Sequence, residues 1–308
     1  MGTQENYLQL GTEVREGTAL VALESTVISH GLPYPQNLET ARALEDVVRQ
    51  RGATPATIAL LDGKIRVGLG QPELERLATE KDVAKVSRRD LPVVLARRGL
   101  GATTVAATMY AAYLANIKVF GTGGLGGVHR GATTTFDISA DLTELARTPV
   151  IVICAGAKSI LDLSLTLEYL ETQGVPVIGY RTDELPAFYT SRSGIGLEAR
   201  ADTPEEVARI ARIKWDLGLS GGIVVAVPPP PEADLPYQEI EKAISRALAA
   251  ADKAGVKGKA VTPFLLNAVR LETEGKSLET NMALLKNNVG IAAEIALALL
   301  GNGTEEFI

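Results

Sequence analysis

The second half of the chain alternates short apolar segments with longer amphipathic ones, and this alternation limits the possible folds more than any other feature. The apolar, β-branched runs Val150–Cys154, Pro176–Tyr180 and Gly222–Val227 have the length of strands covered on both faces. Residues 159–174 have the apolar period of a helix, and Thr203–Glu206 forms a capping box that opens another. This alternation predicts an α/β fold, a three-layer α/β/α sandwich around a central, largely parallel or mixed sheet.

The first part of the chain predicts further elements of this fold. Leu20–Leu23 is typical of a strand, and residues 24–35 combine a glutamate, hydroxyls, a histidine and two prolines, as in a rigid pocket wall. A helix is expected from an N-cap at Asn37 to Gly52. The dipeptide Asp62-Gly63 lies between two apolar runs and predicts a β-hairpin.

Length and charge exclude several classes of protein. A chain of 308 residues, 46% of them hydrophobic, can bury a large core, and we expect one catalytic domain over residues 1–308 with residues 1–17 as an N-terminal extension. The net charge of -6 and the lack of a basic stripe argue against nucleic acid or an anionic membrane as a partner. Without a signal peptide or eighteen uninterrupted apolar residues, a cytoplasmic protein is expected. The single cysteine, Cys154, lies in an apolar run and is interpreted as a core residue.

The most unusual stretch of the chain is a glycine-rich segment at residues 121–131. Six of its eleven residues are glycine, so its backbone must closely approach another group. It also contains His129, one of only two histidines. Because this segment follows a predicted strand, it is expected at the carboxyl edge of the sheet, where α/β proteins bind ligands.

The same segment satisfies the dinucleotide-binding pattern G-x-G-x-x-G through Gly121, Gly123 and Gly126. That pattern requires a helix to begin directly after it. Residues 128–137 instead contain another glycine and three successive threonines, without a helical apolar period. A nicotinamide-dependent enzyme is therefore a poor second interpretation.

Two carboxylates and a serine form a turn just after the glycine-rich segment. Ser139 is a good N-cap for the helix that follows, which would place Asp137 and Asp141 at a helix N-terminus. The two acids could hold a hydrated Mg²⁺ or Mn²⁺ ion, whereas Zn²⁺ would need more nitrogen or sulfur ligands. Simple helix capping is the alternative explanation, and composition alone favours it.

Three further charged residues are candidates for chemistry. Lys158 follows the buried run Val150–Cys154 and could be a Schiff-base nucleophile, although most lysines are only solvated. Glu24 ends the strand Leu20–Leu23, and a functional role and simple exposure are equally compatible with that place. Lys85 could bind an anionic ligand, but composition favours solvent exposure.

Several segments of the chain closely resemble one family. They read ALESTVISHGLPYPQNLETA, KVSRRDLP, GATTVAATM, VFGTGGLGGVHRGA, FDISADL, VICAGAKSILD, TPFLLNAV and SLETNMALLKNN. In this order, from about residue 18 to 300, they resemble the pseudouridine-5'-phosphate glycosidase family, also called the indigoidine synthase A-like family. The resemblance implies an α/β/α fold, a homotrimer, and a reversible, Mn²⁺-dependent cleavage of pseudouridine 5'-phosphate to uracil and ribose 5-phosphate.

The resemblance also implies roles for individual residues, with no departure at the key positions. Glu24 matches the proton donor, Lys158 the nucleophile and Asp137 the ligand of one Mn²⁺ ion per subunit. The other matching positions bind substrate or line the same pocket: Lys85, Val105, Ser139, Ala140, Asp141, Thr122, His129 and Asn281.

This family chemistry explains why a lysine is needed, because the leaving atom is carbon and cannot depart as an oxygen leaving group does. Glu24 would protonate the ribose ring oxygen while Lys158 adds at C1', and the opened sugar would become an iminium as uracil C5 is protonated and released. Water, positioned by Asp141, would then hydrolyse the imine. Two alternatives are another Schiff-base sugar-phosphate lyase of the aldolase type and a catalytically silent metabolite-binding protein.

Overall fold

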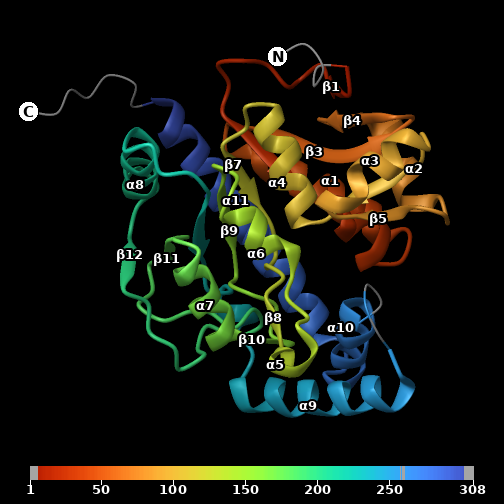
Figure 1. The fold of residues 1–308 in the computed structure, drawn as a ribbon, viewed down its shortest axis with the longest axis vertical. Coiled ribbons are helices and arrows are strands. Elements are labelled where there is room, and N and C mark those ends of the chain that lie inside the picture. Colours follow the sequence, from red (N-terminus) through yellow and green to blue (C-terminus); the bar gives the residue numbers. More distant parts are fainter. Residues whose placement is uncertain (1–5, 257, 259–260, 302–308) are drawn as a thin grey trace, which may run out of the picture.

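A computed structural model describes residues 6–256, 258 and 261–301, and it confirms the predicted α/β/α sandwich around a mixed, largely parallel sheet (Figure 1). The strands are β1 Leu8–Leu10, β2 Leu20–Leu23, β3 Thr54–Leu61, β4 Lys64–Val67, β5 Ala84–Val86, β6 Gly101–Thr103, β7 Val119–Gly121, β8 Val128–His129, β9 Ile151–Cys154, β10 Leu161–Asp162, β11 Val177–Tyr180, β12 Ala199–Ala201 and β13 Ile223–Ala226. The α-helices are α1 Gln36–Gln50, α2 Gln71–Thr79, α3 Leu91–Ala96, α4 Val105–Leu114, α5 Ala132–Thr135, α6 Ala140–Leu145, α7 Leu163–Thr172, α8 Pro204–Asp216, α9 Tyr237–Ala254, α10 Val261–Glu272 and α11 Lys276–Gly301. Short π or 3₁₀ turns are η1 Val27–Gly31, η2 Arg88–Asp90 and η3 Pro231–Ala233.

The main sheet has eleven strands in the order β1-β4-β3-β2-β7-β9-β13-β11-β12, with β6 pairing β3 and β5. All pairs from β3 to β12 along this order are parallel, whereas β4 and β6 run antiparallel to β3. Parallel strands need crossover helices, and these helices cover both faces of the sheet.

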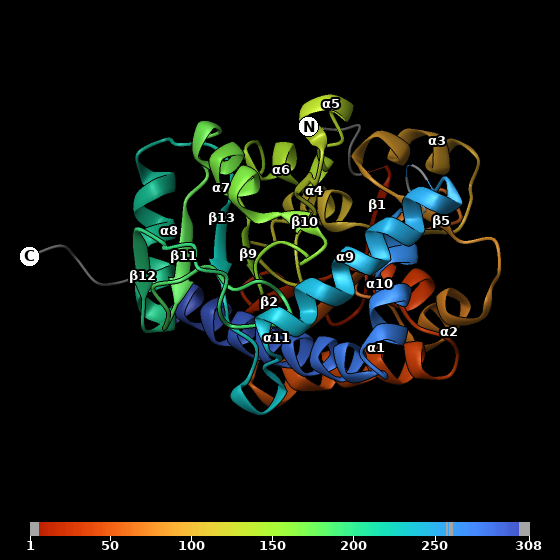
Figure 2. The same ribbon diagram turned by 90° about the horizontal axis from the view of Figure 1, so that it is seen from below.

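Helices α1, α8 and α11 cover one face of the sheet, and α4, α6 and α7 cover the other (Figure 2). Strand β9 shows the consequence for side chains. Ile151 and Ile153 pack in the core on the α11 side, while Val152 and Cys154 pack in the core on the α4 side. Burial raises the pKa of the Cys154 thiol to about 12, so the thiol stays protonated and its interpretation as a core residue is confirmed.

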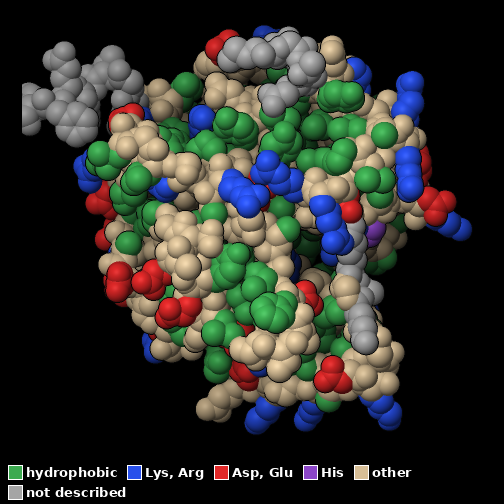
Figure 3. Space-filling view, in the orientation of Figure 1, with side chains coloured by type: hydrophobic (Ala, Val, Ile, Leu, Met, Phe, Trp, Pro, Cys, Tyr) green, Lys and Arg blue, Asp and Glu red, His purple; other side chains and the backbone are tan. Residues whose placement is uncertain are grey.

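Helix α11 is long and apolar enough to cross a membrane by length and composition, with a mean hydropathy of 1.5 over its apolar window. In the fold, 56% of that window is buried, and the helix packs against α1, α8 and the strands β2, β7 and β9. Its position in the core explains the apolar sequence without a membrane. On the face drawn in Figure 3, Lys and Arg side chains are interspersed with Asp and Glu and form no continuous basic surface.

The predicted hairpin is confirmed, and the N-terminal segment adds a strand beside it. Strands β3 and β4 pair antiparallel around Asp62 and Gly63, whose φ angles of 53° and 85° are those of a tight two-residue turn. Strand β1 then pairs with β4. Of the predicted extension 1–17, residues 6–17 therefore include an edge strand, and residues 1–5 lie outside the described residues.

Two local predictions were wrong in detail. Helix α1 begins at Gln36, and Asn37 is no N-cap: it is buried, and its Nδ2 donates to the carbonyls of Ile28 and Ala78 at 2.9 and 3.0 Å. The helix predicted over residues 159–174 begins only at Leu163, because the preceding two residues pair with β8 as strand β10. In each case a long-range contact replaced a local preference.

Packing of α11 on the sheet should contribute strongly to stability. Ile295 is fully buried in this interface, so Ile295→Ala should lower the free energy of unfolding by about 2–5 kcal/mol. Leu300, which is 49% exposed on the same helix, provides the control: Leu300→Ala should change it by less than about 0.5 kcal/mol. Urea denaturation measures both variants, and equal losses would contradict the assignment of α11 to the core.

Candidate functional site

Three neighbouring parallel strands end at the same edge of the sheet, and each is followed by a polar side chain. Glu24 follows β2, Thr122 follows β7, and Lys158 lies four residues beyond β9. The sheet order places β7 between β2 and β9, so the three side chains converge at the carboxyl edge. In open α/β sheets this edge is where ligands bind.

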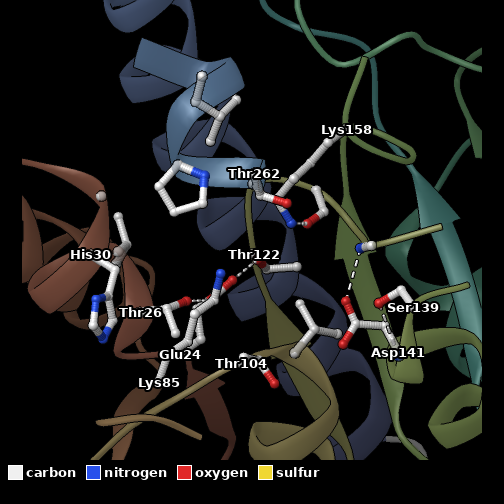
Figure 4. Close-up of a pocket in the computed structure, with 18 of the residues that line it drawn as sticks. Glu24, Thr26, His30, Lys85, Thr104, Thr122, Ser139, Asp141, Lys158 and Thr262 are labelled. Carbon is white, nitrogen blue, oxygen red and sulfur yellow. Dashed lines mark hydrogen bonds between the residues drawn. The ribbon is translucent and has the colours of Figure 1, made fainter. Parts of the chain in front are cut away.

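A cavity of about 260 Å³ lies at this edge, and Glu24 and Lys158 both line it (Figure 4). Most of the predicted site residues are among its lining residues: Glu24, Lys85, Val105, Thr122, His129, Ser139, Ala140, Asp141, Lys158 and Asn281. Asp137 is not among them. A cavity of this size, with cationic, anionic and hydroxyl side chains in its wall, fits one small polar metabolite.

The carboxylate of Glu24 is oriented by two threonines. Thr26 Oγ1 donates to Oε2, and Thr122 Oγ1 donates to Oε1 at 2.5 Å (Figure 4). Each carboxylate oxygen therefore has a fixed hydroxyl neighbour, and the group is held with its oxygens at the cavity wall. A carboxyl group oriented in this way can exchange a proton with a bound ligand.

Lys158 is held by the glycine-rich segment. Its Nζ donates to the carbonyl oxygen of Gly124 at 2.7 Å (Figure 4). No larger residue fits at position 124, because a Cβ there would lie 2.6 Å from the ring of Phe188 and 3.1 Å from the carbonyl oxygen of Gly156. The glycine thus lets the backbone approach close enough to orient the amine, as the glycine density of the segment predicted.

Asp141 connects the glycine-rich segment to helix α4. Its Oδ1 accepts from the backbone N–H of Ala106 at 2.9 Å, and its Oδ2 accepts from that of Gly126 at 2.8 Å. Ser139 caps α6 as predicted, since its Oγ accepts from the N–H of Asp141 at 3.2 Å. The side chain of Asp141 is only 7% exposed, so it holds two elements of the site in place as well as lining the cavity.

Asp137 lies beside the cavity and is half-exposed. Its Oδ2 is 3.8 Å from Nδ1 of His129, and its carbonyl oxygen accepts from the N–H of the same histidine at 3.0 Å. Within the described ranges, no group of three His, Cys, Asp or Glu side chains could hold a metal ion. Any ion at Asp137 would therefore take most of its ligands from water.

The structure adds cavity residues that were not assigned from the sequence. His30, in the predicted pocket wall on η1, lines the cavity, and burial, followed by the charge of Lys85, lowers the pKa of its imidazole. Thr262, Pro263 and Leu266 come from α10, whose sequence is part of the TPFLLNAV segment. The remaining unassigned lining residues are Thr26, Val27, Gly31, Ser87, Thr104, Gly123, Gly124, Gly126, Leu161, Phe188 and Leu285.

Arg130, also unassigned from the sequence, joins the segment after β8 to helix α9 and to the loop that carries Lys158. Its guanidinium contacts both carboxylate oxygens of Glu241 on α9, at 2.8 and 3.1 Å. It also donates to the carbonyl oxygen of Ser159, directly after Lys158, at 3.1 Å. Such a bidentate pair fixes direction as well as distance, so Arg130 ties α9 to the loop that carries the lysine.

Comparison with known proteins gives a consistent result over nearly the whole chain. The model of a family described as "Indigoidine synthase A like protein" matches residues 9–298. A relative from Caldanaerobacter subterraneus subsp. tengcongensis, named pseudouridine-5'-phosphate glycosidase, is 59% identical over 297 residues, 95% of this chain and 97% of its own. A relative of the same name from Clostridium botulinum is 57% identical over 300 residues, 96% of this chain and 98% of its own.

Two solved structures share the fold. The prealnumycin C-glycosynthase AlnA in complex with ribulose 5-phosphate superposes with a TM-score of 0.89 at 40% identity, covering 96% of this chain and 97% of that one. An indigoidine synthase A-like protein from Thermotoga maritima gives a TM-score of 0.89 at 37% identity, with the same coverage of both chains.

The two backbone hydrogen bonds of Asp141 predict a large effect on stability. Asp141→Ala leaves the buried N–H of Ala106 and the part-buried N–H of Gly126 without their acceptor, which should lower the free energy of unfolding by on the order of 3 kcal/mol. Asp141→Asn keeps one acceptor oxygen, so its free energy of unfolding should fall by less. Asp46→Ala is the control, because that carboxylate is exposed. Urea denaturation measures the stabilities of the three variants. An unchanged stability of Asp141→Ala would contradict the role assigned to the carboxylate.

Proposed function

The chain belongs to the indigoidine synthase A-like family, and from this premise we propose that it cleaves the carbon–carbon glycosidic bond of pseudouridine 5'-phosphate to give uracil and ribose 5-phosphate, reversibly. The observation that supports this most directly is that Glu24 and Lys158 line one small cavity. Relatives named pseudouridine-5'-phosphate glycosidase cover 95–96% of the chain, and a C-glycosynthase structure in complex with ribulose 5-phosphate has the same fold.

The reaction begins with the opening of the ribose ring. Lys158 Nζ adds to C1' while the bond from C1' to the ring oxygen breaks, and Glu24 gives that oxygen a proton. The nitrogen then loses a proton, and uracil C5 takes up a proton on the electron pair of its C5=C6 double bond. The nitrogen lone pair forms the C1'=N iminium as the C1'–C5 bond breaks, and the electron pair of that bond restores the C5=C6 double bond as uracil leaves.

Hydrolysis completes the cycle. Water adds to the iminium carbon, which releases ribose 5-phosphate in its open aldehyde form and restores the free amine of Lys158. Asp141 faces the cavity and accepts one backbone hydrogen bond on each carboxylate oxygen, so a further lone pair on each can orient this water.

The phosphate has several possible partners in the cavity wall. Lys85 and His129 line it, and helix α4 begins there at Val105. The N-terminus of a helix favours an anion, and because the N–H of Ala106 is already bound to Asp141, the phosphate would use the other N–H groups of this first turn. Beside it, the buried Oγ1 of Thr104 has no hydrogen-bond partner within the described parts of the chain. Ser139, Ala140 and Asn281 supply the remaining polar wall.

Asp137 is the residue that would hold Mn²⁺. One half-exposed carboxylate, with His129 nearby, suits a hydrated ion that prefers oxygen ligands and does not suit Zn²⁺. When bound, the ion supplies positive charge that orients polar groups through its waters. Assembly as a homotrimer and a cytoplasmic location stay predictions.

Replacement of the nucleophile tests the proposed function. The wild-type chain with pseudouridine 5'-phosphate and Mn²⁺ should release uracil, and Lys158→Ala should lose at least about 10³-fold of this activity, because the covalent route is removed. Lys81→Ala, at an exposed lysine, is the control and should retain wild-type turnover. Uracil is measured by chromatography, and normal release by Lys158→Ala would refute the assignment of the nucleophile.

Wild-type protein that releases no uracil would contradict the glycosidase, and a second measurement then separates the alternatives. Borohydride reduces an iminium to a stable adduct, so incubation with ribose 5-phosphate and borohydride should attach the sugar to Lys158. An adduct without uracil release would indicate an aldolase-type lyase. The absence of both would indicate a metabolite-binding protein.

The role of Asp137 predicts a changed metal requirement. Asp137→Asn removes the carboxylate charge and should raise the Mn²⁺ concentration for half-maximal activity at least about tenfold. Electron paramagnetic resonance of free Mn²⁺ should show the same weakening of binding without substrate. Asp252→Asn, at an exposed aspartate, should bind Mn²⁺ as the wild type does. Unchanged binding by Asp137→Asn would place the ion elsewhere.

A further inference from the structure

Two residues of the glycine-rich segment, separated only by Gly123, contact the two reacting side chains. The hydroxyl of Thr122 donates to Glu24, and two residues later the carbonyl oxygen of Gly124 accepts from Lys158. A shift of residues 122–124 would therefore move the acid and the nucleophile together. Whatever fixes this stretch also fixes the relative position of the two groups.

On the sheet side, the stretch is fixed by strand β9. The N–H of Thr122 donates to the carbonyl oxygen of Ile153 at 2.9 Å, and the N–H of Ala155 donates to that of Gly123 at 2.9 Å. On the opposite side lies helix α11. There Nδ2 of Asn288 donates to the carbonyl oxygens of Thr122 and Gly123, at 2.9 and 3.4 Å.

Helix α11 packs directly on the backbone of this segment. A Cβ at Gly121 would lie 3.1 Å from Cα of Val289, and one at Gly123 would lie 3.3 Å from Cγ of Leu285. The helix therefore acts as a rigid support, and Asn288 is its polar contact with the carbonyls of the segment.

Asn288 is polar at a position where packing alone would favour an apolar residue. Its side chain is fully buried on a helix whose neighbouring residues Leu284, Val289 and Ala292 belong to the hydrophobic core. Its Oδ1 has no hydrogen-bond partner among the residues that the structure describes. A buried unpaired acceptor destabilises a fold, so core stability does not explain this side chain.

We propose that Asn288 is a positioning residue that acts on Glu24 and Lys158 through residues 122–124. Asn288 does not line the cavity and touches neither reacting group. The amide of Asn288 fixes the carbonyl groups of Thr122 and Gly123. The segment in turn positions the hydroxyl of Thr122, which orients Glu24, and the carbonyl of Gly124, which orients Lys158. The inference rests on the proposed glycosidase function and adds a positioning residue to its mechanism.

The variant Asn288→Leu tests this role because leucine fills a similar space without a donor. The kcat for uracil release should fall on the order of 10²-fold, since small misplacements of reacting groups have effects of that size. KM should stay within about threefold, because the substrate contacts are unchanged. Borohydride trapping of ribose 5-phosphate on Lys158 at saturating sugar phosphate should slow by a similar factor.

Thr280→Val is the matched control on the same helix. Thr280 is also buried, and its hydroxyl donates to the carbonyl oxygen of Ala233 at 2.8 Å, away from residues 122–124. Thr280→Val should keep kcat within about twofold even where its melting temperature falls as much as that of Asn288→Leu. Should Asn288→Leu not fold, Asn288→Asp, which presents an acceptor to the same carbonyls, replaces it with the same expected kinetics.

Several results would overturn the proposal. These are an unchanged kcat or trapping rate in the folded Asn288 variant, a loss confined to KM, or the same kinetic loss in Thr280→Val. Failure of both Asn288 variants to fold would make the residue a determinant of folding and would also reject it. Wild-type protein that releases no uracil contradicts the proposed function instead, so the two failures are distinguishable.

Discussion

The site depends on one constraint, the parallel pairing of β2, β7 and β9. Leu23 pairs with Gly121, and Gly121 pairs with Ile153, so the three chains leave the sheet at nearly the same level. This pairing is possible because helices bury both faces of the sheet. The three side chains that follow these strands, Glu24, Thr122 and Lys158, therefore lie close together, although they are far apart in the sequence.

Backbone atoms of the glycine-rich segment bind and orient the functional side chains of this site. The carbonyl of Gly124 orients Lys158, and the N–H of Gly126 binds Asp141. At position 126 a Cβ would lie 2.2 Å from Oγ of Ser139, so the carboxylate turn can approach only a glycine. The high glycine content thus follows from close packing on three sides, and the dinucleotide-binding interpretation is not needed.

The strands and helices of the sandwich were predictable from apolar periodicity, because burial on one or two faces leaves a local signature. The starts of two helices were not predictable in this way. Asn37 is not an N-cap because it donates to the carbonyl of Ala78, and the helix after Lys158 begins late because residues 161–162 pair with β8. Composition alone left Glu24 and Lys158 undecided, and only the family resemblance gave them roles. The contacts of Arg130 and Asn288 have no local signal, because their partners lie 29 to 166 residues away.

Asp137 and Asp141 show why residue type and spacing did not settle the roles in this turn. The two carboxylates are four residues apart, yet Asp137 is half-exposed and Asp141 is buried with two backbone N–H donors. Both oxygens of Asp141 already bind backbone N–H groups of α4 and the glycine-rich segment, and a metal ion on this carboxylate would weaken these two hydrogen bonds. The half-exposed carboxylate of Asp137 does not hold two elements together in this way and can exchange its ligands with solvent. Burial therefore assigns structural support to Asp141 and leaves Asp137 as the carboxylate proposed to bind a cation, a division that depends on the folded surroundings of each side chain.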